Sequence, residues 1–145
     1  MQVADILARK GTAVATVAPD DTVRAVVAKL KEIGVGALVV SANGTTIDGI
    51  VSERDIVRRL DTDGADLLDL TVDQIMTRDV VTCSLPDRAD GLLSMMTGRR
   101  IRHLPVIEGN SLAGIVSIGD VVKSRLDELV EEAKALEGYI QNSGY

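Results

Sequence analysis

Two phrases of the chain place a serine and an aspartate three residues apart, directly after a short apolar run. They are Ser52 and Asp55 in GIVSERDIV, and Ser117 and Asp120 in GIVSIGDVV. Each apolar run predicts a strand, so a helix is expected to begin near each serine, where free backbone N–H groups favour anions. A carboxylate at this place can also accept two hydrogen bonds from the vicinal diol of a ribose. From these residues alone, ordinary helix capping explains the spacing more simply.

Cationic side chains that would suit a phosphate lie before the second phrase. Arg102 and His103 open the apolar run at 101–107, and a guanidinium can contact phosphate through two hydrogen bonds. The corresponding residues of the first half are Gly36 and Ala37, which carry no charge. His103 is the only histidine of the chain, and an isolated histidine is more often structural than catalytic, so we do not predict a general base.

Arg54 gives the first half a positive charge at a different place. It lies inside the first phrase, where the second phrase has Gly119. The basic residues of the two halves are therefore complementary. If the halves are related by a pseudo-twofold axis, Arg54, Arg102 and His103 could converge on one phosphate, and two equivalent phosphate sites are not expected. The alternative for such basic residues is a solvated rim.

The two phrases belong to a longer internal repeat. They lie 65 residues apart, VGALVV at 35–40 matches IRHLPV at 101–106 at an offset of 66, and VADI at 3–6 matches VDQI at 72–75 at an offset of 69. These offsets indicate one unit of roughly 60 residues that has been duplicated with small changes in its loops. Such a repeat usually cannot bury its apolar face alone.

Each unit is expected to read strand, helix, strand, strand, helix. The predicted strands are 12–18, 35–41, 47–52, 80–84, 101–107 and 112–117. The predicted helices are 3–8, 22–33, 53–60, 72–77, 87–99 and 119 to about 141. Strands that alternate with helices indicate the α/β class with α+β layering. The predicted domains are repeat 1 at 1–60, a polar joint at 61–71, repeat 2 at 72–126, and a helical extension and tail at 127–145.

The last predicted helix carries a long apolar stripe. Acidic residues cover its other side. The stripe comprises Leu126, Leu129, Val130, Ala133, Leu136 and Ile140. An amphipathic helix of this kind either packs across its own domain or contacts a partner helix in an oligomer.

Composition excludes several other classes of function. The net charge of −6 argues against general nucleic-acid binding, which needs a basic face. One cysteine, Cys83, forms no internal disulfide and no CxxC metal site. One Cys and one His cannot form a metal cluster, and no motif supports catalysis. No apolar run approaches the ~18 residues of a membrane span, so we expect a cytoplasmic protein with neither a metal nor a required cofactor.

The repeated phrases give the chain a resemblance to a known family. GIVSERDIV and RIRHLPVIEGNSLAGIVSIGDVV resemble the most recognisable segments of the CBS domain pair, or Bateman module, and the match covers nearly the whole chain. The tail EGYIQNSGY is similar to that of small stand-alone CBS-pair proteins. The resemblance implies two α/β units around a pseudo-twofold axis, with two clefts between their sheets.

The resemblance also implies a function. In CBS pairs, the positions of Ser52, Asp55, Ser117 and Asp120 resemble the ribose-binding Asp and its Ser or Thr partner, and those of Arg102 and His103 often contact nucleotide phosphates. This favours a sensor of adenosine nucleotides over capping alone. AMP is the first candidate, and ATP, ADP, NAD(H) and S-adenosylmethionine are its rivals. The alternative class is a ligand-independent interaction module that regulates a partner enzyme.

The adenosine ligand that the resemblance implies has an adenine base, which would need a flat apolar slot. The chain has no Phe and no Trp, so aliphatic side chains would have to enclose the base. Backbone groups of Thr16 and Thr82 could read its edge. The candidates for the slot are Thr16, Val17, Leu38 and Val39 in the first half, and Thr82, Cys83, Leu104 and Pro105 in the second. Core packing is the alternative explanation for most of them.

The same family implies a homodimer, because CBS pairs commonly assemble into head-to-head or head-to-tail discs. The residues agree, since the helices that end the repeats carry more apolar side chains than one small sheet needs. We expect helices 53–60 and 119–126 at the centre of a twofold dimer, with 127–141 reaching over the partner. A target protein is also expected, but the sequence does not identify it.

Overall fold

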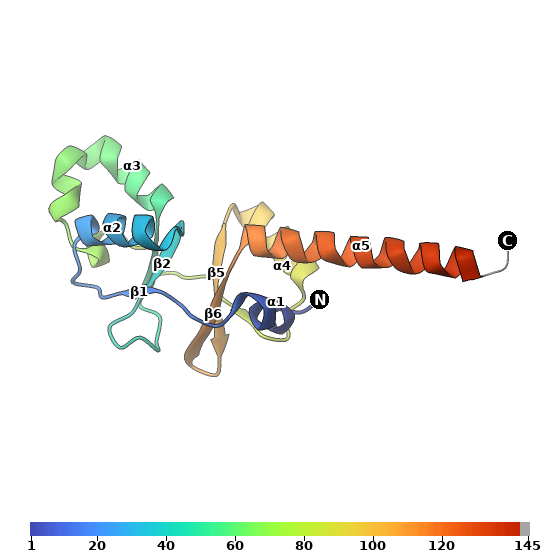
Figure 1. Ribbon diagram of the computed structural model, residues 1–145. Coiled ribbons are helices and arrows are strands. Elements are labelled where there is room, and N and C mark those ends of the chain that lie inside the picture. Colours follow the sequence, from blue (N-terminus) through green and yellow to red (C-terminus); the bar gives the residue numbers. More distant parts are fainter. Residues whose placement is uncertain (143–145) are drawn as a thin grey trace.

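The computed structural model describes residues 1–142. Each repeat builds a three-stranded sheet, in which the first strand runs parallel to the second and the second antiparallel to the third (Figure 1). The strands are β1 (Thr16–Val17), β2 (Ala37–Val40), β3 (Gly49–Ser52), β4 (Cys83–Ser84), β5 (His103–Glu108) and β6 (Ser111–Ser117). The predicted α/β class with two similar units is confirmed.

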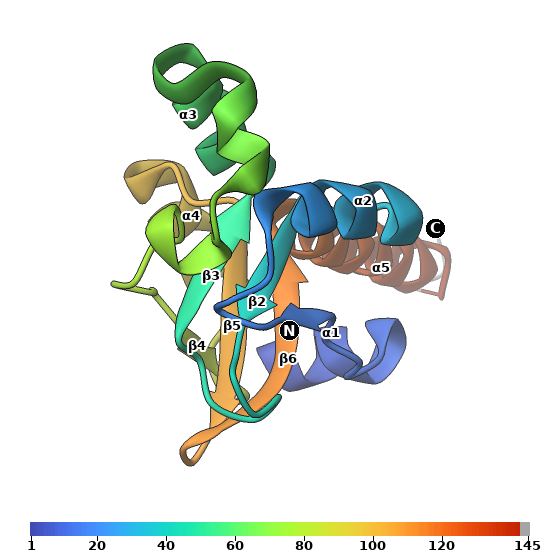
Figure 2. The same cartoon turned by 90° about the vertical axis from the view of Figure 1, so that its left-hand side faces the viewer.

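Helices flank both sheets. They are α1 (Val3–Lys10), α2 (Val23–Ile33), α3 (Glu53–Asp63), α4 (Ala89–Arg99) and α5 (Ile118–Asn142), with short 3-10 helices at Gly64–Asp69 and Val72–Gln74. In Figure 2 the sheet of the first half lies in front of that of the second, with α2 and α3 on the side of the first half. Helix α2 shows why the sequence folds this way. Thr22 Oγ1 accepts a hydrogen bond from the Ala25 amide at 3.2 Å, and Gly34 ends the helix with a φ of 76°.

Two predicted strands are much shorter in the structure. The runs 12–18 and 80–84 form only two residues of strand each. The missing residues lie mainly before each strand, at 12–15 and 80–82, and a turn carboxylate accepts from a backbone amide at the end of each strand. Asp21 accepts from the amide of Ala18 at 2.9 Å, and Asp87 accepts from that of Ser84 at 2.8 Å.

The predicted polar joint at 61–71 is an ordered part of the first half. Helix α3 continues into it as far as Asp63, and a 3-10 helix follows at Gly64–Asp69. Leu67 in this helix is fully buried and belongs to the first core. The predicted helix at 72–77 is reduced to one 3-10 turn, which Thr71 and Gln74 cap reciprocally.

The first segment of each repeat packs in the opposite half. Val72, Ile75 and Met76 complete the core around β1–β3, whereas α1 packs against β6 and α5 in the second half (Figure 1). Backbone pairing holds the first exchange, since Ile50 and Thr77 exchange N–H···O bonds of 3.0 and 2.9 Å. Each core therefore depends on a segment of the other repeat.

A glycine of the repeated phrase makes room for each exchanged segment. A Cβ at Gly49 would lie 2.8 Å from the carbonyl oxygen of Thr77 and 2.5 Å from Met76 Sδ. A Cβ at Gly114, the matching position, would lie 2.8 Å from Leu7 Cδ1. The glycine that opens each GIVS phrase thus permits a close approach of backbone or side chain to the sheet.

Helix α5 is only partly covered by the rest of the molecule. It extends well beyond the second half (Figure 1), and only Val121 and Ser124 of it are buried. The predicted apolar stripe is exposed along its length, from Leu126 at 57% to Leu136 at 63%. The last three residues of the predicted tail, 143–145, lie outside the described residues. Within residues 1–142, no helix is both long and apolar enough to cross a membrane.

We predict that Gly49→Ala lowers the free energy of unfolding by about 1–3 kcal/mol, the usual cost of overpacking. The carbonyl oxygen of Thr77 cannot retreat without breaking its pairing with Ile50. Gly98→Ala in α4 is the control, because a Cβ there meets nothing within 4 Å and alanine favours a helix. Urea unfolding of both variants tests this, and an equal effect of the two substitutions would contradict it.

Candidate functional site

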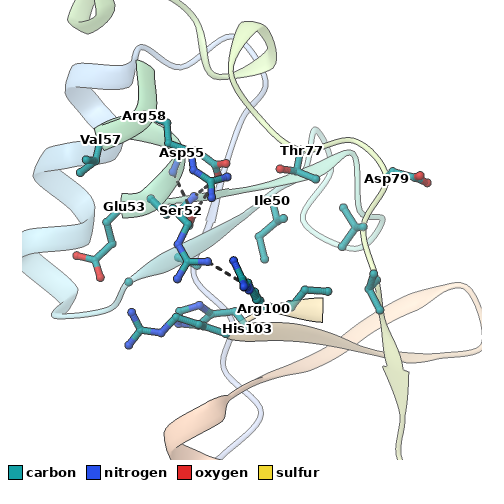
Figure 3. A pocket seen from close by; sticks show the side chains of 17 residues that line it. Ile50, Ser52, Glu53, Asp55, Val57, Arg58, Thr77, Asp79, Arg100 and His103 are labelled. Carbon is teal, nitrogen blue, oxygen red and sulfur yellow. Dashed lines mark hydrogen bonds between the residues drawn. The ribbon is translucent and has the colours of Figure 1, made fainter. Parts of the chain in front are cut away.

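A cavity of about 730 Å³ lies between the two halves and is lined by both. One wall is the start of α3 with the adjoining ends of β2 and β3. The opposite wall is formed by residues 100–103 at the entrance to β5, and the exchanged segment contributes residues from Thr77 to Val81. Figure 3 shows Ser52, Glu53 and Asp55 on the first wall, and Arg100 and His103 across the cavity from them.

Asp55 stands in this cavity with a defined orientation. Its Oδ2 accepts hydrogen bonds from the amide and the hydroxyl of Ser52, at 2.8 and 3.0 Å. The Ser52 hydroxyl in turn accepts from the Asp55 amide at 3.3 Å, which completes a capping box at the start of α3. Both interpretations of the first phrase are thus compatible, because Asp55 caps the helix and also faces the cavity. Within the described residues, no cationic side chain forms an ion pair with Asp55.

The three predicted phosphate contacts all line the same cavity. Arg54 reaches across from α3, where its Nη1 donates to the carbonyl oxygen of Arg100 at 3.1 Å. Arg102 and His103 come from the opposite wall. Sequence reasoning missed two further lining cations, Arg58 and Arg100. Arg58 lies three residues after Asp55 on the predicted helix, and residues at this spacing share one face of a helix. That spacing could have identified Arg58 as a lining residue.

His103 occupies a central and half-buried position. It pairs with Ser117 across β5 and β6, and a Cβ at Gly36 would lie 3.3 Å from its Cε1. Burial lowers the pKa of His103 below its usual range, and the positive charges of Arg102 and Lys10 lower it further, against the opposing effect of Glu53 and Asp120. The imidazole is therefore neutral at pH 7, and an anion bound beside it would favour its protonation.

The second phrase forms the same cap but lies outside this cavity. Asp120 Oδ2 accepts from the Ser117 amide at 2.8 Å, and the Asp120 amide donates to the Ser117 hydroxyl at 3.1 Å. The same Oδ2 accepts from Lys10 Nζ at 2.6 Å. Burial by itself would raise the pKa of Asp120, but the hydrogen bonds from Lys10 and Ser117 outweigh it and hold that pKa below its ordinary value.

The residues predicted to enclose a base do not line the cavity. Val17, Leu38, Val39, Cys83, Leu104 and Pro105 are buried, and Thr16 and Thr82 are half-buried. Burial raises the pKa of the Cys83 thiol to about 12, with a smaller contribution from Asp87. The apolar lining comes from other residues: Ala37, Ile50, Val57, Val80, Val81 and Ile101. The base-pocket assignment of Thr16, Val17, Leu38, Val39, Thr82, Cys83, Leu104 and Pro105 stays a prediction.

Val80 and Val81 were missed because they line the cavity only as a result of the exchange of segments. Residues from Thr77 to Val81 follow the stretch that packs in the first half. The repeat offsets alone do not reveal that exchange. For metal chemistry, residues 1–142 contain no group of three or more His, Cys, Asp or Glu side chains that could hold an ion.

Comparison with known proteins gives consistent matches to both halves. The family described as "CBS domain" matches at residues 3–62 and 72–127. The chain is 38% identical over 130 residues to CBSX3, a mitochondrial CBS domain-containing protein of Arabidopsis thaliana, covering 87% of this chain and 63% of that protein. The chain thus spans less than two thirds of that relative.

Solved structures agree with the fold. A CBS-domain containing protein of Agrobacterium tumefaciens is 44% identical, with a TM-score of 0.83 and coverage of 86% of this chain and 99% of that one. The CBS domain pair of protein MJ0100, crystallised with 5′-methylthioadenosine and S-adenosyl-L-methionine, is 23% identical with a TM-score of 0.75. That match covers 88% of this chain and 98% of the other, and it shows likeness of fold alone.

The lowered pKa of His103 predicts a dependence of stability on pH. The unfolded chain takes up a proton at His103 near pH 6.5, whereas the folded chain resists protonation until the pH is lower. The contribution of neutral His103 to the free energy of unfolding is therefore fully present above pH 6.5, and it falls as the pH drops toward the pKa of His103 in the folded chain. Urea unfolding at pH 7.5 and 5.5 should show a smaller fall for His103→Gln than for the wild type. An equal fall in the two proteins would contradict the assignment.

Proposed function

The chain belongs to the CBS domain family, and on this basis we propose that it is a sensor that binds an adenosine nucleotide, AMP first, in the cavity beside Asp55. The observation that carries the proposal is the meeting of three kinds of group in one cavity. A capped carboxylate, an apolar lining and several cations all face the same space. The volume of about 730 Å³ lies within the usual range for small-molecule sites, about 300–1,000 Å³.

The ribose is proposed to bind at Asp55. Its carboxylate is held in place by Ser52 through two hydrogen bonds and is not neutralised by a cation of the described chain. It can therefore accept from both hydroxyls of a diol, in the way that acidic residues of dinucleotide sites do. Ser52 both holds Asp55 and lines the cavity.

The phosphate is proposed to bind across the cavity, at Arg102 and His103 with Arg54 from α3. Four arginines and one histidine line the cavity, against three carboxylates, those of Glu53, Asp55 and Asp79. This surplus of positive charge favours an anionic ligand such as AMP over S-adenosylmethionine, whose sulfonium is cationic. The guanidinium groups suit phosphate through paired hydrogen bonds.

The base is proposed to lie against the aliphatic side chains of Ile50, Val80, Val81 and Ile101, which line the cavity. The complex of the MJ0100 domain pair supports this in general terms, because a CBS pair of similar fold was crystallised with two adenosine compounds. The eight residues predicted from the sequence, six of them buried and two half-buried, are proposed to pack behind this slot. Binding, with no chemical step, is the proposed activity.

A homodimer is proposed as the assembly that carries the signal. Helix α3 exposes Val57 at 64% and Leu60 at 45%, and α5 exposes Leu126 and Leu129 at 57% and 44%. Exposed apolar surface of this extent marks an interface, and a twofold axis would cover both helices at once. The nucleotide would lie at the first turn of α3, so its occupancy could bias the dimer geometry.

Calorimetric titration with AMP and adenosine tests the site. Asp55→Ala should weaken AMP binding by about 1.5–3 kcal/mol, the range for charge-assisted hydrogen bonds, while Asp61→Ala on the exposed face of α3 should leave it unchanged. Wild-type affinity in Asp55→Ala would contradict the ribose assignment.

The same titrations test the phosphate contact. Arg102→Ala should weaken AMP binding far more than adenosine binding, because only AMP carries the phosphate. Arg99→Ala, which lies outside the cavity, should affect neither. Equal losses of affinity for AMP and adenosine in Arg102→Ala would mean that the role of Arg102 is structural.

Light scattering tests the assembly. We expect twice the chain mass of 15.4 kDa at micromolar concentration, because burial of Val57 and Leu126 needs a second copy. Leu126→Glu should yield monomers, since a carboxylate would be buried at the interface. Glu131→Gln, on an exposed part of α5, is the control and should stay dimeric. A wild-type monomer with and without AMP would refute the dimer.

A further inference from the structure

The carboxylate of the second phrase already has a cationic partner. Lys10, at the end of α1, donates from Nζ to Asp120 Oδ2 at 2.6 Å and to the carbonyl oxygen of Ile115 at 2.9 Å. The two charged side chains are 35% and 25% exposed, so the pair is partly withdrawn from water. Oδ2 of Asp120 also accepts from the Ser117 amide. Oδ2 of Asp55 likewise accepts from the Ser52 amide, so the ion pair with Lys10 is what distinguishes Asp120 from Asp55.

The position that matches Lys10 in the other repeat carries the opposite charge. The offset of 69 that aligns Val3 with Val72 also aligns Lys10 with Asp79. Asp79 lines the large cavity together with Asp55, and a carboxylate cannot form an ion pair with another carboxylate. The exchanged segments therefore leave one aspartate open and neutralise the other.

The surroundings of Asp120 differ in the same direction. The hollow next to it measures about 260 Å³ and is lined only by residues of α1, α5 and Met1. No residue of the first sheet reaches it. Gly36 and Ala37, the positions that match Arg102 and His103 in the repeat, line the large cavity and not this hollow. The second half-site thus has less space and no phosphate-binding cations from the partner half.

We propose that Lys10 acts as a latch that holds the second half-site closed, so that each chain takes up one adenosine ligand, beside Asp55. The inference rests on the proposed function of that first site. A neutral diol competes poorly with an ammonium group for the same carboxylate oxygen, because the ion pair adds charge to the hydrogen bond. Removal of the ammonium would leave Asp120 capped by Ser117 and unpaired, as Asp55 is now. Because Arg54, Arg102 and His103 all line the other cavity, adenosine without a phosphate is the ligand that probes the opened half-site.

Calorimetry with adenosine on the full chain counts the sites. Wild type should bind one adenosine per chain, Lys10→Ala should bind two, and Lys10→Ala with Asp120→Ala should bind one again. Lys134→Ala is the control, since Lys134 lies on an exposed part of α5 and lines neither the large cavity nor the hollow beside Asp120. It should still bind one. Lys10→Ser serves as a second variant in case the alanine variant does not fold.

The results separate this inference from the proposed function. Two adenosines per wild-type chain, or a single one in both Lys10 variants, would overturn the latch and leave the Asp55 site standing. No binding by wild type would overturn the proposed function. In that case, a gain of one adenosine on removing Lys10, lost again with Asp120→Ala, would still support the latch, and no gain would overturn it.

Discussion

The backbone pairing between Ile50 and Thr77 is the constraint on which the rest of the structure depends. Its two hydrogen bonds, of 3.0 and 2.9 Å, attach the beginning of the second repeat to the sheet of the first, and they require a glycine at position 49. Helix α1 makes the reverse exchange into the second half over Gly114. Neither core is complete without a segment of the other repeat, which explains why the unit occurs as a pair. The same pairing places Thr77 and the valines after it at the wall of the cavity.

The exchange also explains how a duplicated scaffold acquires two unlike half-sites. Both Ser-x-x-Asp phrases form the same cap, with nearly equal distances from the serine amide to the aspartate. What differs is the charge that the two exchanged segments carry at matching positions. Asp79 faces the open cavity, and Lys10 pairs with Asp120. His103 is close enough to both helix starts that the charges of Glu53 and Asp120 both act on its pKa. One cavity thus concentrates the cations of both halves.

The sequence predicts the architecture well because its signals are local and repeated. Gly34 and the two capping serines mark helix boundaries. At matching positions of the repeats, Arg54 corresponds to Gly119 and Arg102 to Gly36, and this complementarity predicts that the cations gather at one place. The cavity lining agrees with that prediction. The spacing of Val72 and Ile75 predicts a buried face, but it does not say which sheet buries it. For this reason the sequence could not predict that Val80 and Val81 line the cavity, or that Lys10 pairs with Asp120. Leu38 and Leu104 could be identified as apolar strand residues, but their exact role could not.

The most direct test of the account is a crystal structure of the protein grown with AMP. The account predicts one nucleotide per chain in the cavity between the halves, with its ribose hydroxyls within hydrogen-bonding distance of Asp55 and its phosphate against Arg102 and His103. Lys10 should still contact Asp120 in the same crystal. A nucleotide bound beside Asp120, or one in the cavity with its phosphate directed toward Asp55, would contradict the account.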